Sequence, residues 1–285
     1  SFETRRSGSC SVTVMTPEDF DRLQTLLATR AGFRLTRDRM HLAEHRLGPV
    51  ARREGYHNVE AMLASLWGKP VASLGWAVIE ALLNGETWFR RDRAAFDVFS
   101  RELMPALTAA RPGGKVRLWS AGASTGQEAY SLAIAALENS ADVEILATDL
   151  SRQAIDKATS GLYTSFEIQR GLSARAMLRW FEQTDDHWRA RPELRSTVRF
   201  ERANLLDEPA NDRQFDVIFC RHLLTDLEPA RRAQVLDMLE RQLVDDGCLF
   251  LGVDERPDGD SVAFRPVAGR KGLYVKAPSA LRRAA

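Results

Sequence analysis

The sequence predicts an α/β fold: a mostly parallel, doubly wound sheet that follows a small N-terminal all-helical domain and carries a small hairpin insertion. Three observations support this class. After residue 114, short apolar runs alternate with helical segments, which is typical of parallel strands covered on both faces. Before residue 84 the apolar residues recur at helical spacing. Between residues 162 and 199 a long segment lacks a central strand, which indicates an insertion.

The helical domain is expected over residues 16–83. Its first helix has Thr16 as its N-cap and ends at Gly32. The second follows Thr36 and should break at Gly48-Pro49, since a proline inside a helix lacks the N–H and clashes with the preceding turn. Two further helices are expected over 58–67 and 71–83.

The rest of the chain is divided by changes in its apolar period. Residues 1–15 have no stable period and begin without Met, so we expect a tail without function, either mobile or left from expression. Residues 84–114 are expected to link the helical domain to a catalytic domain over 115–285. The hairpin insertion is expected within 163–197.

The strands of the sheet follow from the apolar runs. We expect them over 115–121, 143–148, 198–203, 215–220 and 248–253, with covering helices that include 127–137 and 229–243. A closing antiparallel hairpin is expected at one edge, from 262–267 and 272–276. In the insertion, Asp185-Asp186 should turn a hairpin that sets Trp180-Phe181 against Trp188-Arg189.

Charge and composition exclude several classes of protein. The 285 residues carry 40 basic and 39 acidic side chains, so no field of the whole chain attracts nucleic acid or a membrane surface. No apolar run approaches the ~20 residues needed to span a bilayer, and we expect a cytoplasmic protein without membrane insertion. Cys10, Cys220 and Cys248 form no CxxC pair and are expected as core residues where they flank strands. We therefore expect neither a disulfide framework nor a metal site.

The strongest local pattern is a strand that runs into a glycine-rich turn and then a helix, over Leu118–Glu128. Ligands of open α/β sheets bind at such carboxyl ends of strands. The spacing from Gly122 to Gly126 is GxxxG, which is not a dinucleotide motif, and the turn has no Lys to make it a P-loop. Glu128 in the first helical turn would also repel a phosphate.

A second acid, Asp149, ends the next expected strand 23 residues beyond Gly126, near the ~20-residue offset at which an acid binds ribose hydroxyls. A positively charged nucleoside without phosphate suits both acids, and S-adenosylmethionine is such a ligand. The alternative is structural. The glycines would then only make a tight turn, and Asp149 would cap the helix that begins near Ser151.

Several motifs in order resemble one known family. Residues 119–131 match Trp-Ser-Ala-Gly-Cys-Ser-Thr-Gly-Glu-Glu-Pro-Tyr-Ser, with Ala123, Gln127 and Ala129 as departures. Residues 85–92 match a Gly-Glu-Thr-aromatic-Phe-Phe-Arg-Asp motif, with Arg90 in place of the second Phe. Further matches are Ala147-Thr148-Asp149, residues 158–163, Asn204-Leu205-Leu206 and Phe215–Arg221. From about Phe20 to Lys276 the chain resembles the CheR-type chemoreceptor glutamate O-methyltransferases.

The resemblance implies a sheet of the S-adenosylmethionine methyltransferase type and a set of site residues. The implied cofactor contacts are Thr87 and Arg91 from the linker, Gly122 and Glu128, Asp149 for the ribose, Asn204 and Leu205 for the adenine side, and His222 and Leu223. The implied reaction is methyl transfer to glutamate carboxylates of a chemoreceptor's cytoplasmic region or a related signalling protein, with S-adenosylhomocysteine as product. A nucleic-acid methyltransferase is disfavoured, because no Asp/Asn-Pro-Pro-aromatic tetrad occurs.

The chemistry of such a transfer requires no general base, because a glutamate with a pKa of ~4.3 is already ionised at pH 7. Catalysis then consists of holding the carboxylate in line with the methyl group in a site without water. Arg91 is the candidate catalytic residue, because its planar guanidinium matches two carboxylate oxygens.

The stretch after Arg221 departs most from the family pattern. Asp226 stands where the family has Tyr, and three explanations are open: it caps the helix that begins near Pro229, the substrate differs, or the protein is a cofactor-binding adaptor with weak or altered activity. His222 stands where the family has Asn and either contacts the nucleoside or only ends the strand.

Two surface features have both a functional and a structural explanation. A basic set in the helical domain either docks on acidic receptor helices or is a solvated face; it comprises Arg37, Arg39, Arg46, Arg52 and Arg53. Trp180, Phe181 and Trp188 either pack the inserted hairpin or, as the family's hairpin does, present an edge to a receptor peptide.

Overall fold

The computed structural model describes residues 15–69, 71–209, 214–257 and 263–277. The chain forms two compact units. One comprises the chain up to Arg30 together with Arg34–Leu83, and the other comprises Ala31–Phe33 with Asn84 onward. The expected tail over 1–15 lies outside the described residues except for Met15, which is buried.

The first unit is helical. Its elements are α1 (Pro17–Arg30), the 3-10 turn η1 (Arg37–Arg39), α2 (Met40–Arg53), α3 (Val59–Gly68) and α4 (Ala72–Leu82). The expected break at Gly48-Pro49 is wrong, because α2 continues through Pro49. Pro49 cannot donate to the carbonyl one turn before it, but Leu47, Val50 and Ala51 around it are buried. Packing of this apolar face outweighs the lost hydrogen bond.

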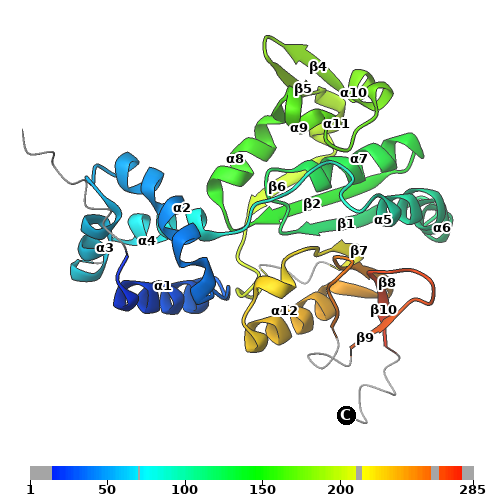
Figure 1. Ribbon diagram of the computed structural model, residues 1–285. Coiled ribbons are helices and arrows are strands. Elements are labelled where there is room, and N and C mark those ends of the chain that lie inside the picture. Colours follow the sequence, from blue (N-terminus) through cyan, green and yellow to red (C-terminus); the bar gives the residue numbers. More distant parts are fainter. Residues whose placement is uncertain (1–14, 70, 210–213, 258–262, 278–285) are drawn as a thin grey trace, which may run out of the picture. The chain divides into compact units, whose positions relative to one another are not determined.

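The second unit contains a seven-stranded sheet in the order β6-β2-β1-β7-β8-β10-β9 (Figure 1). The first five are parallel, and the hairpin of β9 and β10 closes one edge antiparallel, which confirms the predicted class of fold. The strands are β1 (Val116–Ala121), β2 (Val143–Asp149), β6 (Val198–Arg202), β7 (Phe215–Phe219), β8 (Leu243–Phe250), β9 (Phe264–Pro266) and β10 (Leu273–Lys276). β8 begins five residues before the expected 248. Residue 262 of the expected hairpin lies outside the described residues.

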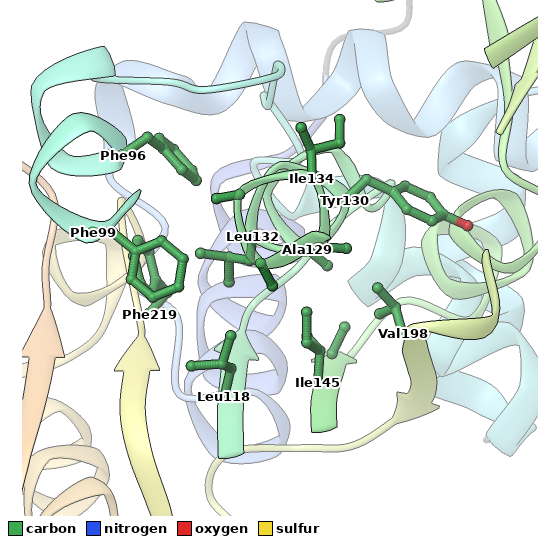
Figure 2. Packing of buried hydrophobic residues seen from close by; sticks show 14 of the residues in the cluster. Phe96, Phe99, Leu118, Ala129, Tyr130, Leu132, Ile134, Ile145, Val198 and Phe219 are labelled. Carbon is green, nitrogen blue, oxygen red and sulfur yellow. The ribbon is translucent and has the colours of Figure 1, made fainter. Parts of the chain in front are cut away.

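Successive strand residues point to opposite sides of the sheet, so apolar strands present apolar side chains on both faces. Helices cover both of these faces. Leu118 and Phe219 pack on the face covered by α7 (Gln127–Glu138), whereas Trp119 and Ile218 pack on the face covered by α12 (Pro229–Gln242). Figure 2 shows the α7 face, where Leu132 and Ala129 lie above the strands and Phe96 and Phe99 lie beside them. The sheet is therefore buried on both sides.

The segment expected to be a linker, 84–114, belongs to this second unit and is largely helical. It forms α5 (Arg93–Val98), a π-helical turn η2 (Phe99–Leu103) and α6 (Met104–Ala110). Phe89, Phe96, Phe99 and Met104 are fully buried in the same core as α7. The residues just before α5 are consequently held against the seven-stranded sheet.

The insertion forms a second, three-stranded sheet in the order β3-β5-β4. Its elements are β3 (Leu162–Thr164), α9 (Ser165–Gln169), α10 (Ala174–Trp180), β4 (Phe181–Thr184), β5 (His187–Ala190) and α11 (Pro192–Ser196), after α8 (Arg152–Ser160). The predicted turn at Asp185-Asp186 is confirmed, but Phe181 pairs with Ala190 and Trp188 with Gln183, because the turn contains only two residues. Trp180 and Phe181 are buried, as the packing explanation requires.

Candidate active site

The carboxyl ends of β1, β2 and β7 lie side by side, with β1 between the other two. After β1 the chain moves to β2, whereas after β7 it moves to β8 on the other side, so β1 and β7 flank the topological switch point. This is where open α/β sheets bind ligands. The loop from Gly122 to Gly126 follows β1, and residues 220–223 follow β7.

The two loops touch at the switch point. A Cβ atom on Gly122 would lie 2.7 Å from Cδ1 of Leu223, and Gly122 has a φ of 81°. A side chain there would require Leu223 to shift and would adopt a left-handed backbone that favours glycine. Half-buried Leu223 therefore packs over the glycine turn and brings the loops after β1 and β7 together.

Four of the five amide groups from Gly122 to Gly126 form hydrogen bonds within the protein. The N–H groups of Gly122 and Ala123 donate to the Thr148 carbonyl at 2.8 and 2.9 Å, and the Gly126 N–H donates to the Ala123 carbonyl at 3.0 Å. The Ser124 N–H donates to the Asp149 carboxylate at 2.8 Å. A phosphate-binding loop instead directs its amides toward the ligand, so this geometry agrees with the exclusion of phosphate.

Asp149 ends β2 and is half-buried beside this loop. Its carboxylate accepts the Ser124 N–H through Oδ2 and the Ser151 N–H through Oδ1, both at 2.8 Å. The cap of α8 is Ser151, whose hydroxyl accepts the Ala154 N–H, so Asp149 is not the helix cap of the structural alternative. A carboxylate has about four acceptor positions, so it can accept hydrogen bonds from more than two groups.

Glu128 lies in the first turn of α7 with only 13% of its side chain exposed. Its carboxylate accepts the Ser120 hydroxyl at 2.8 Å and the Arg221 guanidinium at 3.1 Å. Burying a carboxylate is costly unless it is paired in this way. Glu128 therefore places a fixed negative charge at the carboxyl end of β1.

Arg221 is the central residue of the site and received no role in the sequence analysis. Its guanidinium is only 1% exposed and donates to Asp92 at 2.7 Å, Glu128 at 3.1 Å and the Arg91 carbonyl at 2.7 Å. It also lies over the Phe96 ring at 5.4 Å. One buried cation thus joins the segment before α5, the start of α7 and the end of β7.

His222 and Glu255 organise the loop after β7. The His222 Nε2 lies 2.7 Å from the same Asp92 oxygen that binds Arg221. Glu255 is 3% exposed and accepts the N–H groups of His222, Leu223 and Gly252 at 2.6 to 2.7 Å. His222 has a φ of 59°, and these hydrogen bonds hold that unusual backbone in place.

The first testable prediction concerns this buried carboxylate. Glu255→Gln is expected to lower the free energy of unfolding by about 1 to 3 kcal/mol, because the amide nitrogen would face backbone donors. Urea denaturation followed by circular dichroism measures the change. Glu193→Gln, at an exposed position, is the matched control and should change stability by less than about 0.5 kcal/mol. Equal effects of the two substitutions would show that Glu255 does not hold the loop.

Arg91 is half-buried near the surface of the site. Its Nη1 donates to the Glu86 carbonyl at 2.7 Å, and its guanidinium lies 4.4 Å from the centre of the Trp88 ring. Its buried Nε has no hydrogen-bond partner among the described residues. Thr87 is half-buried on the same segment.

The remaining residues singled out in the sequence follow β6 and β7. Asn204, after β6, accepts the Leu206 N–H through its side chain and forms a turn. Leu205 packs against the core on the α12 face. Asp226 lies in the 3-10 turn η3 (Leu224–Asp226) and is half-buried, while the N-cap of α12 is Glu228. Of the three explanations for Asp226, capping would therefore not be at the N-cap position itself, which Glu228 occupies.

The two described cysteines are core residues, as predicted. Burial raises the pKa of the Cys220 thiol well above its usual value and that of Cys248 to about 11. Neither thiol would ionise near neutral pH, so neither is a nucleophile. Among the described residues, no three His, Cys, Asp or Glu side chains are grouped as metal ligands. No described helix has the length and apolar character needed to cross a membrane.

A mostly parallel sheet of this order, with acids at its switch point and no phosphate loop, is the fold of S-adenosylmethionine-dependent methyltransferases. The family model for the CheR methyltransferase, SAM binding domain, matches residues 85–273. The chain belongs to this CheR methyltransferase family.

Relatives match over most of the chain. The chemotaxis protein methyltransferase Cher2 of Pseudomonas putida is 30% identical over 91% of this chain and 98% of its own length. Chemotaxis protein methyltransferase 1 of Pseudomonas aeruginosa is 31% identical over 91% of this chain and 97% of its own length. The probable biofilm formation methyltransferase WspC of the same species is 32% identical over 63% of this chain and 43% of its own.

The site residues fit S-adenosylmethionine, the cofactor of this family. Carboxylates of Glu128 and Asp149 accept ammonium and hydroxyl donors and favour a positive charge, whereas the loop amides are already bonded. Of the sequence-predicted residues, the structure brings Gly122 and Leu223 into contact and joins Glu128, Arg91 and His222 through Arg221 and Asp92.

Proposed function

We propose that this protein transfers the methyl group of S-adenosylmethionine to glutamate carboxylates in the cytoplasmic region of a methyl-accepting chemoreceptor or related signalling protein, and so acts in the cytoplasm. Two chemotaxis protein methyltransferases that match nearly end to end support this substrate. The observation that carries it is the half-exposed Arg91 guanidinium, whose backbone carbonyl is fixed by buried Arg221. A cation at the entrance of an acid-lined site suits an anionic substrate.

The reaction needs positioning more than acid or base chemistry. When bound, the cofactor supplies an electrophilic methyl group on a sulfonium sulfur. Glu128 and Asp149 would hold its positive and hydroxyl groups, and Leu223 would cover the glycine turn. Arg91 would orient the substrate carboxylate through two parallel N–H bonds. No side chain has to remove a proton, because glutamate is ionised at neutral pH.

Base-labile methyl esters test this function directly. Purified protein, labelled S-adenosylmethionine and receptor cytoplasmic fragments should yield methyl groups that are released by mild alkali. A methyl mark stable to alkali would indicate transfer to nitrogen or carbon. Tight cofactor binding without turnover on any fragment would instead indicate an adaptor.

Arg91→Ala is expected to lower kcat/KM for the receptor fragment by about 10- to 100-fold, because a charge-assisted pair with the carboxylate is lost. The affinity for S-adenosylmethionine, measured by calorimetry, should change by less than about threefold. Arg93→Ala is the matched control, since Arg93 is exposed and pairs loosely with Asp97 at 3.7 Å. If Arg91→Ala weakened cofactor binding as much as catalysis, Arg91 would be a cofactor residue only.

A further inference from the structure

A second arginine stands beside Arg91 on the same aromatic ring. The Arg170 guanidinium lies 3.9 Å from the centre of the Trp88 ring, and that of Arg91 lies 4.4 Å from it. Arg170 directly follows α9 in the insertion and is 79 positions from Arg91 in the sequence. We call Trp88, Arg91 and Arg170 the arginine platform.

The backbone fixes the position of Arg170. The next residue, Gly171, has a φ of 103°, and a Cβ atom there would overlap the carbonyl group of Phe89. The turn after α9 therefore packs directly on the backbone of the segment that carries Trp88 and Arg91. Phe89 continues this contact into the insertion through edge-on packing with Tyr163 and Phe181, at ring separations of 5.1 and 5.5 Å. Arg170 is thus held by packing and is not placed by an exposed ion pair alone.

The platform has an excess of positive charge. Arg170 pairs with the Glu86 carboxylate at 3.0 Å, whereas the Arg91 bond goes to the uncharged backbone carbonyl of the same residue. The nearby acid Asp92 is bound by Arg221 and His222. Among the described residues, the two guanidinium groups are thus balanced by one paired carboxylate, that of Glu86, which binds Arg170, and 40% of the Arg170 side chain stays exposed. The Trp88 ring supports both flat cations, and each has one terminal nitrogen bonded to Glu86. The remaining terminal N–H groups would bind carboxylates.

We propose that Arg170 is a specificity-determining residue: the arginine platform binds acidic side chains that flank the glutamate to be methylated. Arg91 would orient the reacting carboxylate, and Arg170 would bind a neighbouring one on the same substrate. This inference rests on the proposed function and specifies the substrate as an acidic segment of protein. Arg170 would contribute to substrate affinity and not to cofactor binding.

Binding at equilibrium tests the inference without requiring turnover. The probes are a fluorescently labelled receptor cytoplasmic fragment and the same fragment with the acidic residues around its accepting glutamate changed to glutamine. The full-length protein, saturated with S-adenosylhomocysteine, is titrated into each at low salt. Wild-type protein should prefer the acidic fragment, and Arg170→Ala should reduce this preference by about fivefold, the upper range for a partly exposed ion pair. Arg170→Lys keeps the charge without the planar edge, so its preference for the acidic fragment should lie between those of the wild type and Arg170→Ala.

Arg175→Ala is the matched control, because Arg175 is an exposed arginine of α10 in the same insertion. It should keep the wild-type preference, and the thermal midpoints of both alanine variants should agree with that of the wild type. Equal preference in wild type and Arg170→Ala, or an equal loss in Arg175→Ala, overturns the inference. If the wild type forms methyl esters but Arg170→Ala does not change the preference for the acidic fragment, the proposed function stands and the role of Arg170 does not. If Arg170→Ala loses the preference but the wild type forms no methyl esters, the binding role of Arg170 stands and the proposed function does not.

Discussion

Arg221→Ala is expected to lower the free energy of unfolding by about 3 to 5 kcal/mol. The substitution would leave the Asp92 and Glu128 carboxylates partly buried without the cation that lies 2.7 and 3.1 Å from them. Removing one partner of a buried ion pair is costly because the remaining charge stays desolvated. The Arg91 carbonyl would also lose the hydrogen bond that holds its segment. Urea denaturation followed by circular dichroism measures the loss.

A milder variant keeps this prediction testable if the alanine variant does not fold. Arg221→Lys retains the charge but has a single nitrogen for three acceptors, so an intermediate loss is expected. Arg111→Lys is the control, since Arg111 also joins two acids, Asp216 and Asp246, but with 25% of its side chain exposed and away from the site. If Arg221→Lys cost no more than Arg111→Lys, the buried cluster would not be an important source of stability.

Asp149→Ala is expected to weaken the binding of S-adenosylmethionine by about 100-fold. Hydrogen bonds from hydroxyls to a charged acceptor contribute about 1.5 to 3 kcal/mol each, and each 1.4 kcal/mol is a tenfold change in affinity. The loop would also lose the acceptor of the Ser124 N–H. Isothermal titration calorimetry with the full-length protein measures the dissociation constant.

Two comparisons separate the contribution of charge from that of loop shape. Asp149→Asn keeps an oxygen that can accept the Ser124 N–H. A comparable loss of affinity in this variant would therefore show that the negative charge of Asp149, and not the shape of the loop, accounts for the binding. Asp142→Ala is the matched control, because Asp142 lies just before the opposite end of β2 and is 70% exposed. Wild-type affinity in Asp149→Ala would remove this acid from the cofactor pocket.

Much of the sheet and part of the site could be predicted because their determinants are local. The apolar runs define strands whose carboxyl ends are adjacent in any parallel sheet, so Gly122 and Asp149 follow from one loop and one strand end. Arg221 could not be placed in the same way. Its partners Asp92 and Glu128 are 129 and 93 residues distant in the sequence. The numbers of acidic and basic residues do not show which of them form ion pairs. The available signal was an arginine at the end of a nearly all-apolar run, residues 215–220, because a charge buried there requires carboxylates.

The same limit explains the errors in the fold. Pro49 is a local signal for a helix end, but the helix is maintained by tertiary contacts of Leu47, Val50 and Ala51. Arg170 and Trp88 lie in segments that differ in secondary structure and share no pattern. Tertiary contacts bring them together, above all the close packing of Gly171 on Phe89. Local rules predict elements and strand ends, whereas contacts between distant segments determine how charges are shared.

The margins of the large sheet have a consequence for how the chain behaves while it folds. β9 at one margin has only three residues and ends in Pro266, which cannot donate a backbone hydrogen bond. β6 at the other margin exposes Arg199, Glu201 and Arg202. Short, proline-bearing or charged edges discourage a second chain from extending a sheet. Central parallel strands assemble slowly, so these edges protect the nascent protein from aggregation during that interval.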